Sequence, residues 1–387
     1  MADHQRLMVF ILDRLSDLLD KGEMTDRYYN PGDLFSEVHM VLCNDDKPDL
    51  EKLQKAVGNA KLVIHNFTFP RKLFLKSFGY NGFFVKKIKN DILNLTKEIA
   101  PQLIRCHGAH LHTYLCKVIK TSMGVPYVVS MHINPDEDIF NRERHPLRRI
   151  QNWFLRRKII QGLAGANLCL PVYSPIADFL DKNSLTNYKI CYNVLNPSHI
   201  RPKGDYTLGD VVKIVSVGRQ IIEKDCSEII RAVAAMPNVE YTLFGNGPMH
   251  EPMKALARDL NVSDRIHFIP AMPNDELCAI MADFDIFATH TEYWEISKSV
   301  LEALLTGMPV LLNERQGEPV KELTSDICLH VDNGASAYQS TLEKLIKDND
   351  FRENLGRSAL RIANEKWHPD NTEAVFVDIY KKFAIGA

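Results

Sequence analysis

Short apolar runs that alternate with helical patterns constrain the fold of this chain more than any other feature. In the first half, the runs predict strands at residues 8–12, 38–43, 61–65, 103–107, 127–131, 168–172 and 190–192. In the second half, they predict strands at residues 212–217, 240–244, 266–269, 286–289 and 310–312. Helical patterns lie between them, at residues 86–99, 114–121, 227–235, 249–260, 275–282 and 297–305. Strands that alternate with helices indicate an α/β fold, in which helices cover both faces of parallel sheets.

The length of the chain indicates two domains, because 387 residues exceed what one ordinary core supports. Proline, glycine and charged residues replace the periodic pattern between residues 196 and 210, which marks a boundary. We therefore expect an N-terminal domain at residues 1–196, a C-terminal domain at residues 211–365 and a final segment, 366–387, whose amphipathic run 372–383 packs back on the first domain. Two doubly wound domains that face each other across a cleft would bind a ligand at the carboxyl ends of their strands, in that cleft.

The composition is that of a soluble globular protein, with 45% hydrophobic and 25% charged residues. The eight cysteines form no Cys-x-x-Cys pair, which indicates neither a disulfide framework nor a zinc site and fits a reducing compartment. The apolar run 7–12 is too short for a signal-peptide core or a membrane span. We therefore expect a cytoplasmic protein whose first apolar run is a buried strand.

The near-neutral net charge of -2 hides a basic region. Residues 61–160 carry 18 lysines and arginines against 6 aspartates and glutamates, enough to attract an anionic partner. Basic residues interleave with aromatic ones at 71–89 and 142–158, where Trp153 and Phe154 fall on a predicted helix. This pattern fits contact with an anionic membrane surface or, alternatively, a solvated basic face. No nucleic-acid-reading motif accompanies the charge, so we expect no nucleic-acid partner.

The first turn of the second half, "VSVGRQIIEKD", combines Gly218, Arg219 and Lys224 after a predicted strand. Gly218 would let the chain turn tightly, and the two cations would project at the strand end. A guanidinium and an ammonium in one loop suit a pyrophosphate leaving group, on which negative charge develops. The alternative is a solvated basic loop.

The next strand ends in "LFGNGP", where Gly245 and Gly247 would permit close approach of the backbone to a ligand. An ordinary turn is the alternative. Neither this turn nor the preceding one has the spacing Gly-x-Gly-x-x-Gly, which disfavours a nicotinamide cofactor.

A third motif, "THTEYWEISKSVLEALLTGMPVLLNE", follows the predicted strand 286–289. Its apolar positions recur at helical spacing from Ser297 to Gly307, so a helix should begin near Ser297. The N–H groups and the dipole at the amino end of that helix favour a phosphate. Glu302 lies inside the helix, on a different face from Glu292 and Glu295, which precede it.

Taken together, these motifs resemble the retaining glycosyltransferases of family 4, which have the GT-B fold of two Rossmann-like domains. The turns "VGRQIIEKD" and "FGNGP", the strand "IHFIPAM" and the segment "EISKSVLEALLTGMPVLL" match the family's pattern. The resemblance covers about residues 165–385. It implies a nucleotide-sugar donor, transfer to an acceptor hydroxyl in glycan, glycolipid or natural-product biosynthesis, and no metal or other cofactor.

The resemblance also assigns donor contacts. It implies that Arg219 and Lys224 bind the donor diphosphate and that Glu302 holds the ribose hydroxyls. It implies further that the backbone at Ile296, Ser297 and Lys298 supports the distal phosphate.

The family's first glutamate, which contacts the transferred sugar, falls here at Trp294. Either Glu295 takes this role, or Glu292 reaches in, or the role is lost; we favour Glu295.

The first half matches the family less well. In place of a glycine-rich turn after the first strand it has Gly22, which we assign to the acceptor side. By resemblance, His132 in "VVSMHINP" lies near the reacting sugar. His107 is expected at a strand end lining the cleft. His107, His110 and His112 could together bind zinc, but the sequence completes no such site with a carboxylate or thiolate, so we expect no metal.

Two other functional classes stay open: a sugar-nucleotide epimerase or phosphorylase of GT-B fold, and a catalytically weak sugar-nucleotide-binding protein. For the transferase, the resemblance implies that the acceptor hydroxyl approaches on the face that the diphosphate leaves. Its proton would pass to a phosphate oxygen, and no protein nucleophile is required.

Overall fold

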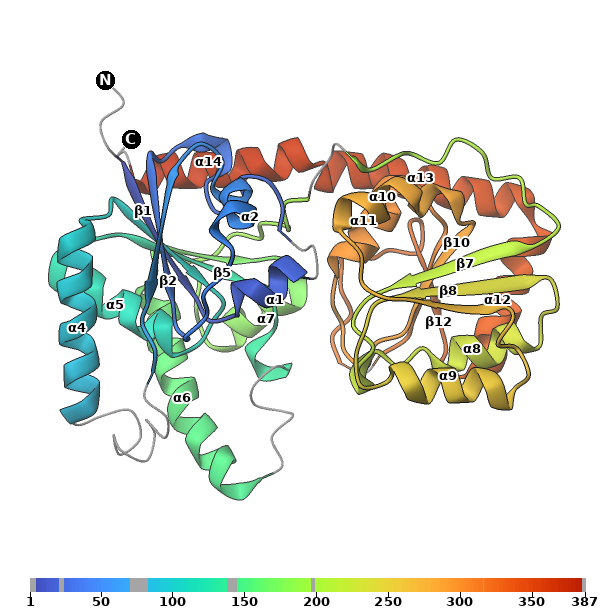
Figure 1. The fold of residues 1–387 in the computed structure, drawn as a ribbon, viewed down its shortest axis with the longest axis horizontal. Helices are drawn as coiled ribbons and strands as arrows, with labels where there is room; N and C mark the ends of the chain where they lie inside the picture. Colours follow the sequence, from blue (N-terminus) through green and yellow to red (C-terminus); the bar gives the residue numbers. More distant parts are fainter. Residues whose placement is uncertain are drawn as a thin grey trace. The chain divides into compact units, whose positions relative to one another are not determined.

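The computed structural model describes residues 5–20, 24–69, 83–137, 145–195, 199–315 and 317–384. The chain forms two compact units, drawn in Figure 1. The first unit comprises Met1–Val194 with Thr372–Ala387, and the second comprises Leu195–Asn371. No helix in the described ranges is both long enough and apolar enough to cross a bilayer.

The first unit is built on a parallel sheet of six described strands in the order β3-β2-β1-β4-β5-β6. The strands are β1 (Arg6–Ile11), β2 (Glu37–Leu42), β3 (Lys61–Asn66), β4 (Leu103–His107), β5 (Tyr127–Met131) and β6 (Leu168–Pro171). The helices are α1 (Leu15–Asp20), α2 (Leu50–Gln54), α4 (Phe83–Ile99), α5 (Leu111–Met123), α6 (Pro146–Gly165) and α7 (Ser174–Lys182). The order reverses between β1 and β4, which are hydrogen-bonded neighbours, so the switch point of this sheet lies there.

The continuous apolar runs of the sequence explain this sheet. Residues Leu7–Ile11 of β1 are fully buried, as a central parallel strand covered on both faces must be. The last helix, α14 (Pro369–Ala384), supplies Phe376, Ile379 and Tyr380 to the same core. The end of the chain therefore completes the first unit.

The second unit repeats the architecture with the strand order β12-β11-β10-β7-β8-β9. The strands are β7 (Val212–Val217), β8 (Val239–Phe244), β9 (Ile266–Ile269), β10 (Ile286–Thr289), β11 (Val310–Asn313) and β12 (Leu329–Val331). The helices are α8 (Ser227–Ala234), α9 (His250–Asp259), α10 (Asn274–Ile280), α11 (Lys298–Thr306), α12 (Ala335–Lys347) and α13 (Asn349–Trp367). β7 pairs with both β8 and β10, so the switch point lies between β7 and β10.

The prediction of a strand at residues 190–192 is wrong. The segment runs beside β6, where the backbone N–H groups of Lys189 and Cys191 donate to the carbonyls of Cys169 and Pro171, but its one strand bridge is at Tyr188. The residues there are apolar because Cys191 and Leu195 are buried, and not because the segment forms a strand ladder. Sequence reasoning also missed β12, which is only three residues long.

Candidate functional site

A pocket of about 370 Å³ lies at the carboxyl ends of β7 and β10, at the switch point of the second sheet. Its wall includes five of the residues predicted to bind a donor: Gly218, Arg219, Lys224, Glu295 and Ser297. The sequence motifs after β7 and β10 are 71 residues apart at Lys224 and Glu295, and the parallel pairing of the two strands brings them together.

Gly245 and Gly247 let the loop after β8 pack against the loop after β7. Their φ angles are +134° and +156°, and a Cβ on either would collide with the backbone carbonyl of Gly218 or Gln220. Gln220 N–H donates to the carbonyl of Asn246 over 2.9 Å, which joins the loops. The close approach that these glycines permit is therefore to the neighbouring loop, where we had expected approach to a ligand.

Gly218 has a different explanation from the one predicted. Its φ is not in the left-handed region, and an added Cβ would meet no atom within 4 Å. The turn itself therefore does not need a glycine. Because Gly218 lines the pocket, the missing side chain leaves space at its wall.

The two residues expected to contact different parts of a donor are joined in an ion pair. Lys224 Nζ donates to Glu295 Oε1 over 2.5 Å, and the two side chains are 15% and 16% exposed. The backbone N–H of Glu292 donates to the carbonyl of Glu223 over 2.9 Å and ties the two loops together. Arg219, which is exposed, forms no ion pair among the residues that the structure describes.

The structure separates the three candidates for the first glutamate. Trp294 is 7% exposed; its indole N–H donates to the carbonyl of Arg315 over 3.2 Å, and its ring packs on His330 with centroids 5.3 Å apart. Glu292 is exposed and does not line the pocket, whereas Glu295 does. The geometry thus places Glu295, and neither Trp294 nor Glu292, beside the predicted phosphate-binding lysine.

Helix α11 begins at the pocket. Ser297 is its N-cap and accepts a hydrogen bond from Val300 N–H over 3.3 Å, as a serine in this position should. Ser299 Oγ donates to the carbonyl of Val217 over 3.0 Å and fixes the helix to the end of β7. Ser297 lines the pocket, but the flanking Ile296 and Lys298 do not.

Glu302, which the resemblance assigns to the ribose hydroxyls of the donor, is buried behind the pocket wall. It is 3% exposed, and its Oε1 accepts a hydrogen bond from Asn274 Nδ2 over 2.9 Å. It does not line the pocket. Burial raises the pKa of the Cys278 thiol well above its ordinary value, and the nearby Glu302 adds to that effect. Sequence reasoning missed Asn274, since an asparagine in the first turn of a helix, here α10, gives no signal beyond the start of that helix.

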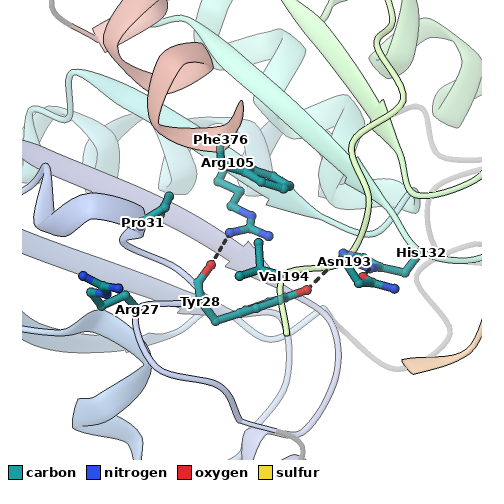
Figure 2. Close-up of a pocket in the computed structure, with 8 residues that line it drawn as sticks. All are labelled: Arg27, Tyr28, Pro31, Arg105, His132, Asn193, Val194 and Phe376. Atoms are coloured by element: carbon teal, nitrogen blue, oxygen red, sulfur yellow. Dashed lines mark hydrogen bonds between the residues drawn. The ribbon is translucent and has the colours of Figure 1, made fainter. Parts of the chain in front are cut away.

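The first unit has its own pocket, which contains one of the predicted histidines (Figure 2). His132 Nδ1 lies 3.0 Å from Asn193 Oδ1 and its Nε2 lies 3.3 Å from the hydroxyl of Tyr28. Since a carbonyl oxygen accepts, His132 donates to Asn193 through Nδ1. The ring of His107 lies 4.4 Å from that of His132, so the structure brings the two predicted residues together. Gly22 falls outside the described residues.

The histidine-rich turn shows no metal-binding cluster. His112 Nε2 lies 2.9 Å from the carbonyl of His107, which identifies it as a donor to the backbone. Burial lowers the pKa of His110 to about 4, which keeps that ring neutral near neutral pH. In the described ranges, no group of three His, Cys, Asp or Glu side chains could hold a metal ion.

The comparisons with known proteins agree with this architecture. Residues 207–361 match the family model for glycosyl transferases group 1. The matched segment lies within the second unit. It includes the pocket at β7 and β10 and every residue of the three motifs that lead to it.

Two curated relatives show how far the sequence similarity extends. Lipopolysaccharide core biosynthesis glycosyltransferase LpsE of Rhizobium meliloti is 29% identical over 150 residues, 38% of this chain and 44% of LpsE. The 2-deoxystreptamine glucosyltransferase of Streptomyces kanamyceticus is 24% identical over 292 residues, 68% of this chain and 73% of that enzyme. The alignment with LpsE thus spans less than half of that relative.

Solved structures extend the likeness to the whole fold. Sucrose-phosphate synthase of Thermosynechococcus elongatus superposes with a TM-score of 0.74 at 13% identity, over 99% of this chain and 100% of that one. Anabaena HepE in complex with UDP and glucose gives 0.72 at 12% identity, over 98% and 100%. Together with the two parallel sheets, these neighbours confirm the GT-B fold class, with two Rossmann-like units.

Proposed function

We propose that this protein transfers a sugar from a nucleotide-sugar donor to an acceptor hydroxyl, and that the second unit binds the donor. The observation that carries the proposal is the pocket at the β7–β10 switch point. There the segment that matches the group 1 model brings together Arg219, the Lys224–Glu295 pair and the capped amino end of α11.

The pocket offers what departure of a diphosphate requires. As the bond between sugar and phosphate breaks, negative charge grows on the phosphate oxygens, and fixed positive groups lower the barrier. Arg219 and Lys224 supply charge, and the first N–H groups of α11 supply oriented dipoles. Glu295 holds Lys224 at the wall and would contact the sugar. The acceptor hydroxyl would attack on the face that the diphosphate leaves, retain the anomeric configuration and give its proton to a phosphate oxygen.

The choice of donors to test follows from the nucleotides and nucleotide sugars that similar proteins bind or use. HepE structures contain UDP or UDP-glucose, and several curated relatives are GDP-mannose-dependent mannosyltransferases that act on phosphatidylinositol monomannoside. We therefore propose UDP- and GDP-sugars as the first donors to screen. Products in glycolipid, glycan or natural-product biosynthesis fit these relatives.

Replacement of Lys224 with alanine tests the proposal. Transfer of radiolabelled sugar should fall at least about tenfold, since one charge-assisted bond to the leaving group is lost. Lys213→Ala is the matched control, because Lys213 is exposed on the same strand, β7, and lies outside the pocket. Equal transfer by the Lys224 and Lys213 variants would contradict the proposed role.

The same assay separates the competing functions. An epimerase would change the donor sugar without an acceptor, and a phosphorylase would release it only with inorganic phosphate. A binding protein would be stabilised by a donor and convert none of it.

We further propose a cytoplasmic enzyme that contacts an anionic membrane through α6. Leu147, Ile150 and Trp153 are 69%, 53% and 49% exposed at a spacing of three residues, which places them on adjacent turns of one helix. Exposed arginines flank them, and the Arg157 guanidinium lies 3.6 Å from the centroid of the Trp153 ring. Of the other basic segment, residues 71–82 lie outside the described ranges.

Vesicle flotation tests this contact. Wild-type protein should float with phosphatidylglycerol vesicles at low salt and less at high salt. The Leu147→Asp/Ile150→Asp variant should lose flotation, while Leu50→Asp should keep it, because Leu50 is an exposed leucine on α2. Flotation that is unchanged in the α6 variant would exclude this helix as the contact.

A further inference from the structure

A buried cation lines the pocket of the first unit. Arg105, in β4, is 1% exposed. Its Nε donates to Ser130 Oγ over 3.1 Å and its Nη1 donates to the carbonyl of Tyr28 over 2.6 Å. Both acceptors are neutral, and no carboxylate of the described residues forms an ion pair with this guanidinium. The positive charge of Arg105 is therefore buried, and its two neutral hydrogen-bond acceptors offset that charge only in part.

Aromatic rings supply part of that compensation. The guanidinium carbon lies 4.9 Å from the ring centroid of Tyr28, 5.4 Å from that of Tyr29 and 5.3 Å from that of Phe376. Such contacts offset some of the cost of taking a charge out of water, but they do not neutralise it. The two hydrogen bonds engage Nε and Nη1, and the buried Tyr380 hydroxyl also faces the guanidinium. The planar fork of a guanidinium suits phosphate and carboxylate oxygens.

Arg105 lies in the wall of a pocket that opens to solvent (Figure 2). Its other wall residues include Tyr28, His132, Asn193 and Val194.

The second arginine at this pocket is already compensated. Arg27 Nη2 lies 3.0 Å from Glu373 Oε2, and the other oxygen of Glu373 accepts from Gly32 N–H over 2.9 Å. Glu373 is thus committed to Arg27 and the backbone. The uncompensated charge at this pocket is that of Arg105.

We propose that this pocket binds one anionic group, a phosphate or a carboxylate, carried by the acceptor substrate. The assignment to the acceptor rests on the proposed function, in which the second unit takes the donor. The anion would complete the coordination of Arg105 and supply its missing negative partner. Acceptors that bear phosphate or carboxylate would then be preferred over neutral sugars.

Thermal unfolding with simple probes tests the site. Inorganic phosphate, glycerol 3-phosphate and acetate are compared with glycerol and with sodium chloride at matched ionic strength. An anion that binds the folded chain should raise Tm by about 3–6 °C for each tenfold increase above its Kd. Phosphate and glycerol 3-phosphate should both do so if the site reads phosphate; acetate alone should do so if it reads carboxylate. No response to any of the three would overturn the proposal.

Variants at the pocket rim and at the guanidinium itself locate the response. Val194→Asp places a carboxylate at the pocket and should abolish the response to anions, whereas the neutral isostere Val194→Asn should keep it. Arg105→Lys should weaken it at least tenfold, because the charge remains and the fork is lost. Lys224→Ala is the control for anion binding at the donor pocket of the second unit. A response lost in Lys224→Ala and retained in Val194→Asp would place the anion in the second unit and refute the inference.

Failure of the proposed function gives a different pattern. A panel of UDP- and GDP-sugars that leaves Tm unchanged counts against donor binding and leaves the anion response in place. Should donors bind and transfer proceed, acceptor competition decides the assignment: glycerol 3-phosphate or acetate should raise the acceptor KM without changing the donor KM. Equal inhibition of Val194→Asp and wild type would refute the assignment to the acceptor.

Discussion

Replacing Glu295 with glutamine should strengthen binding of a nucleoside diphosphate while it slows sugar transfer. In the structure the carboxylate lies 2.5 Å from Lys224 Nζ, and both side chains are about 15% exposed, so solvent screens their charges only partly. A diphosphate that binds Lys224 must approach this carboxylate. At an effective dielectric constant near 20, removal of such a like charge at roughly 6 Å is worth about 3 kcal/mol, which is on the order of a hundredfold in Kd.

Stability and the rate of transfer should both fall in the same variant, although nucleotide binding strengthens. Glutamine keeps the shape of the side chain but weakens its bond to Lys224, so the free energy of unfolding should fall by about 1–2 kcal/mol. Loss of a contact that tightens in the transition state should lower kcat about tenfold.

Isothermal titration with UDP or GDP, urea unfolding and initial rates measure the three effects, with Glu292→Gln as the exposed control. Weaker binding of the nucleotide by Glu295→Gln would refute the reasoning, because it would mean that the carboxylate supports the phosphate site.

Three further predictions concern the pocket glycines, the buried ring of His110 and the expected independence of the reaction from metal ions. Gly247→Ala should lower the free energy of unfolding by about 2–3 kcal/mol in urea, because its Cβ meets the Gln220 backbone, whereas Gly218→Ala should leave stability unchanged and weaken nucleotide binding in titration. As pH falls below about 6.5 the unfolded His110 takes up a proton, but the folded ring does so only near pH 4; stability should therefore fall across that window by at most about 3 kcal/mol, and His110→Asn should reduce the slope in urea unfolding at pH 7.5 and 5. Finally, transfer should be unchanged by EDTA, and a loss restored by Mg²⁺ or Mn²⁺ would contradict the expectation of a metal-free reaction.

Sequence patterns could predict the strands because parallel strands buried on both faces are continuous apolar runs. Residues 103–107, 127–131, 212–217, 266–269 and 286–289 are strands with the predicted bounds. The pattern misled at residues 190–192, where burial against β6 gives the same apolar signal without a ladder.

The site was less predictable because its parts meet only through strand pairing. The residue types after β7 and β10 indicated a phosphate site, but no local pattern shows that Lys224 and Glu295 share a bond. Arg105 lies within an apolar strand in the sequence. Its environment could not be predicted, because Tyr28 and Phe376, which contact it, come from distant parts of the chain. Pairings across such separations are fixed by topology and not by local spacing.

The turn at Trp294 shows how one shifted residue changes a site, and it can be tested. The resemblance places a glutamate at position 294 and a glycine at position 295. The structure instead buries Trp294 between His330 and Arg315, whose guanidinium lies 4.9 Å from the centroid of the indole ring. Trp294→Glu/Glu295→Gly would restore the family's order of residues. It should nonetheless lose about 3 kcal/mol of stability, since a charge replaces a buried ring, and it should lose the partner of Lys224. Trp294→Phe should keep both the fold and transfer. Full activity of the double variant, with unchanged urea unfolding, would show that the register of this turn is free to shift and that Trp294 does not set the position of Glu295.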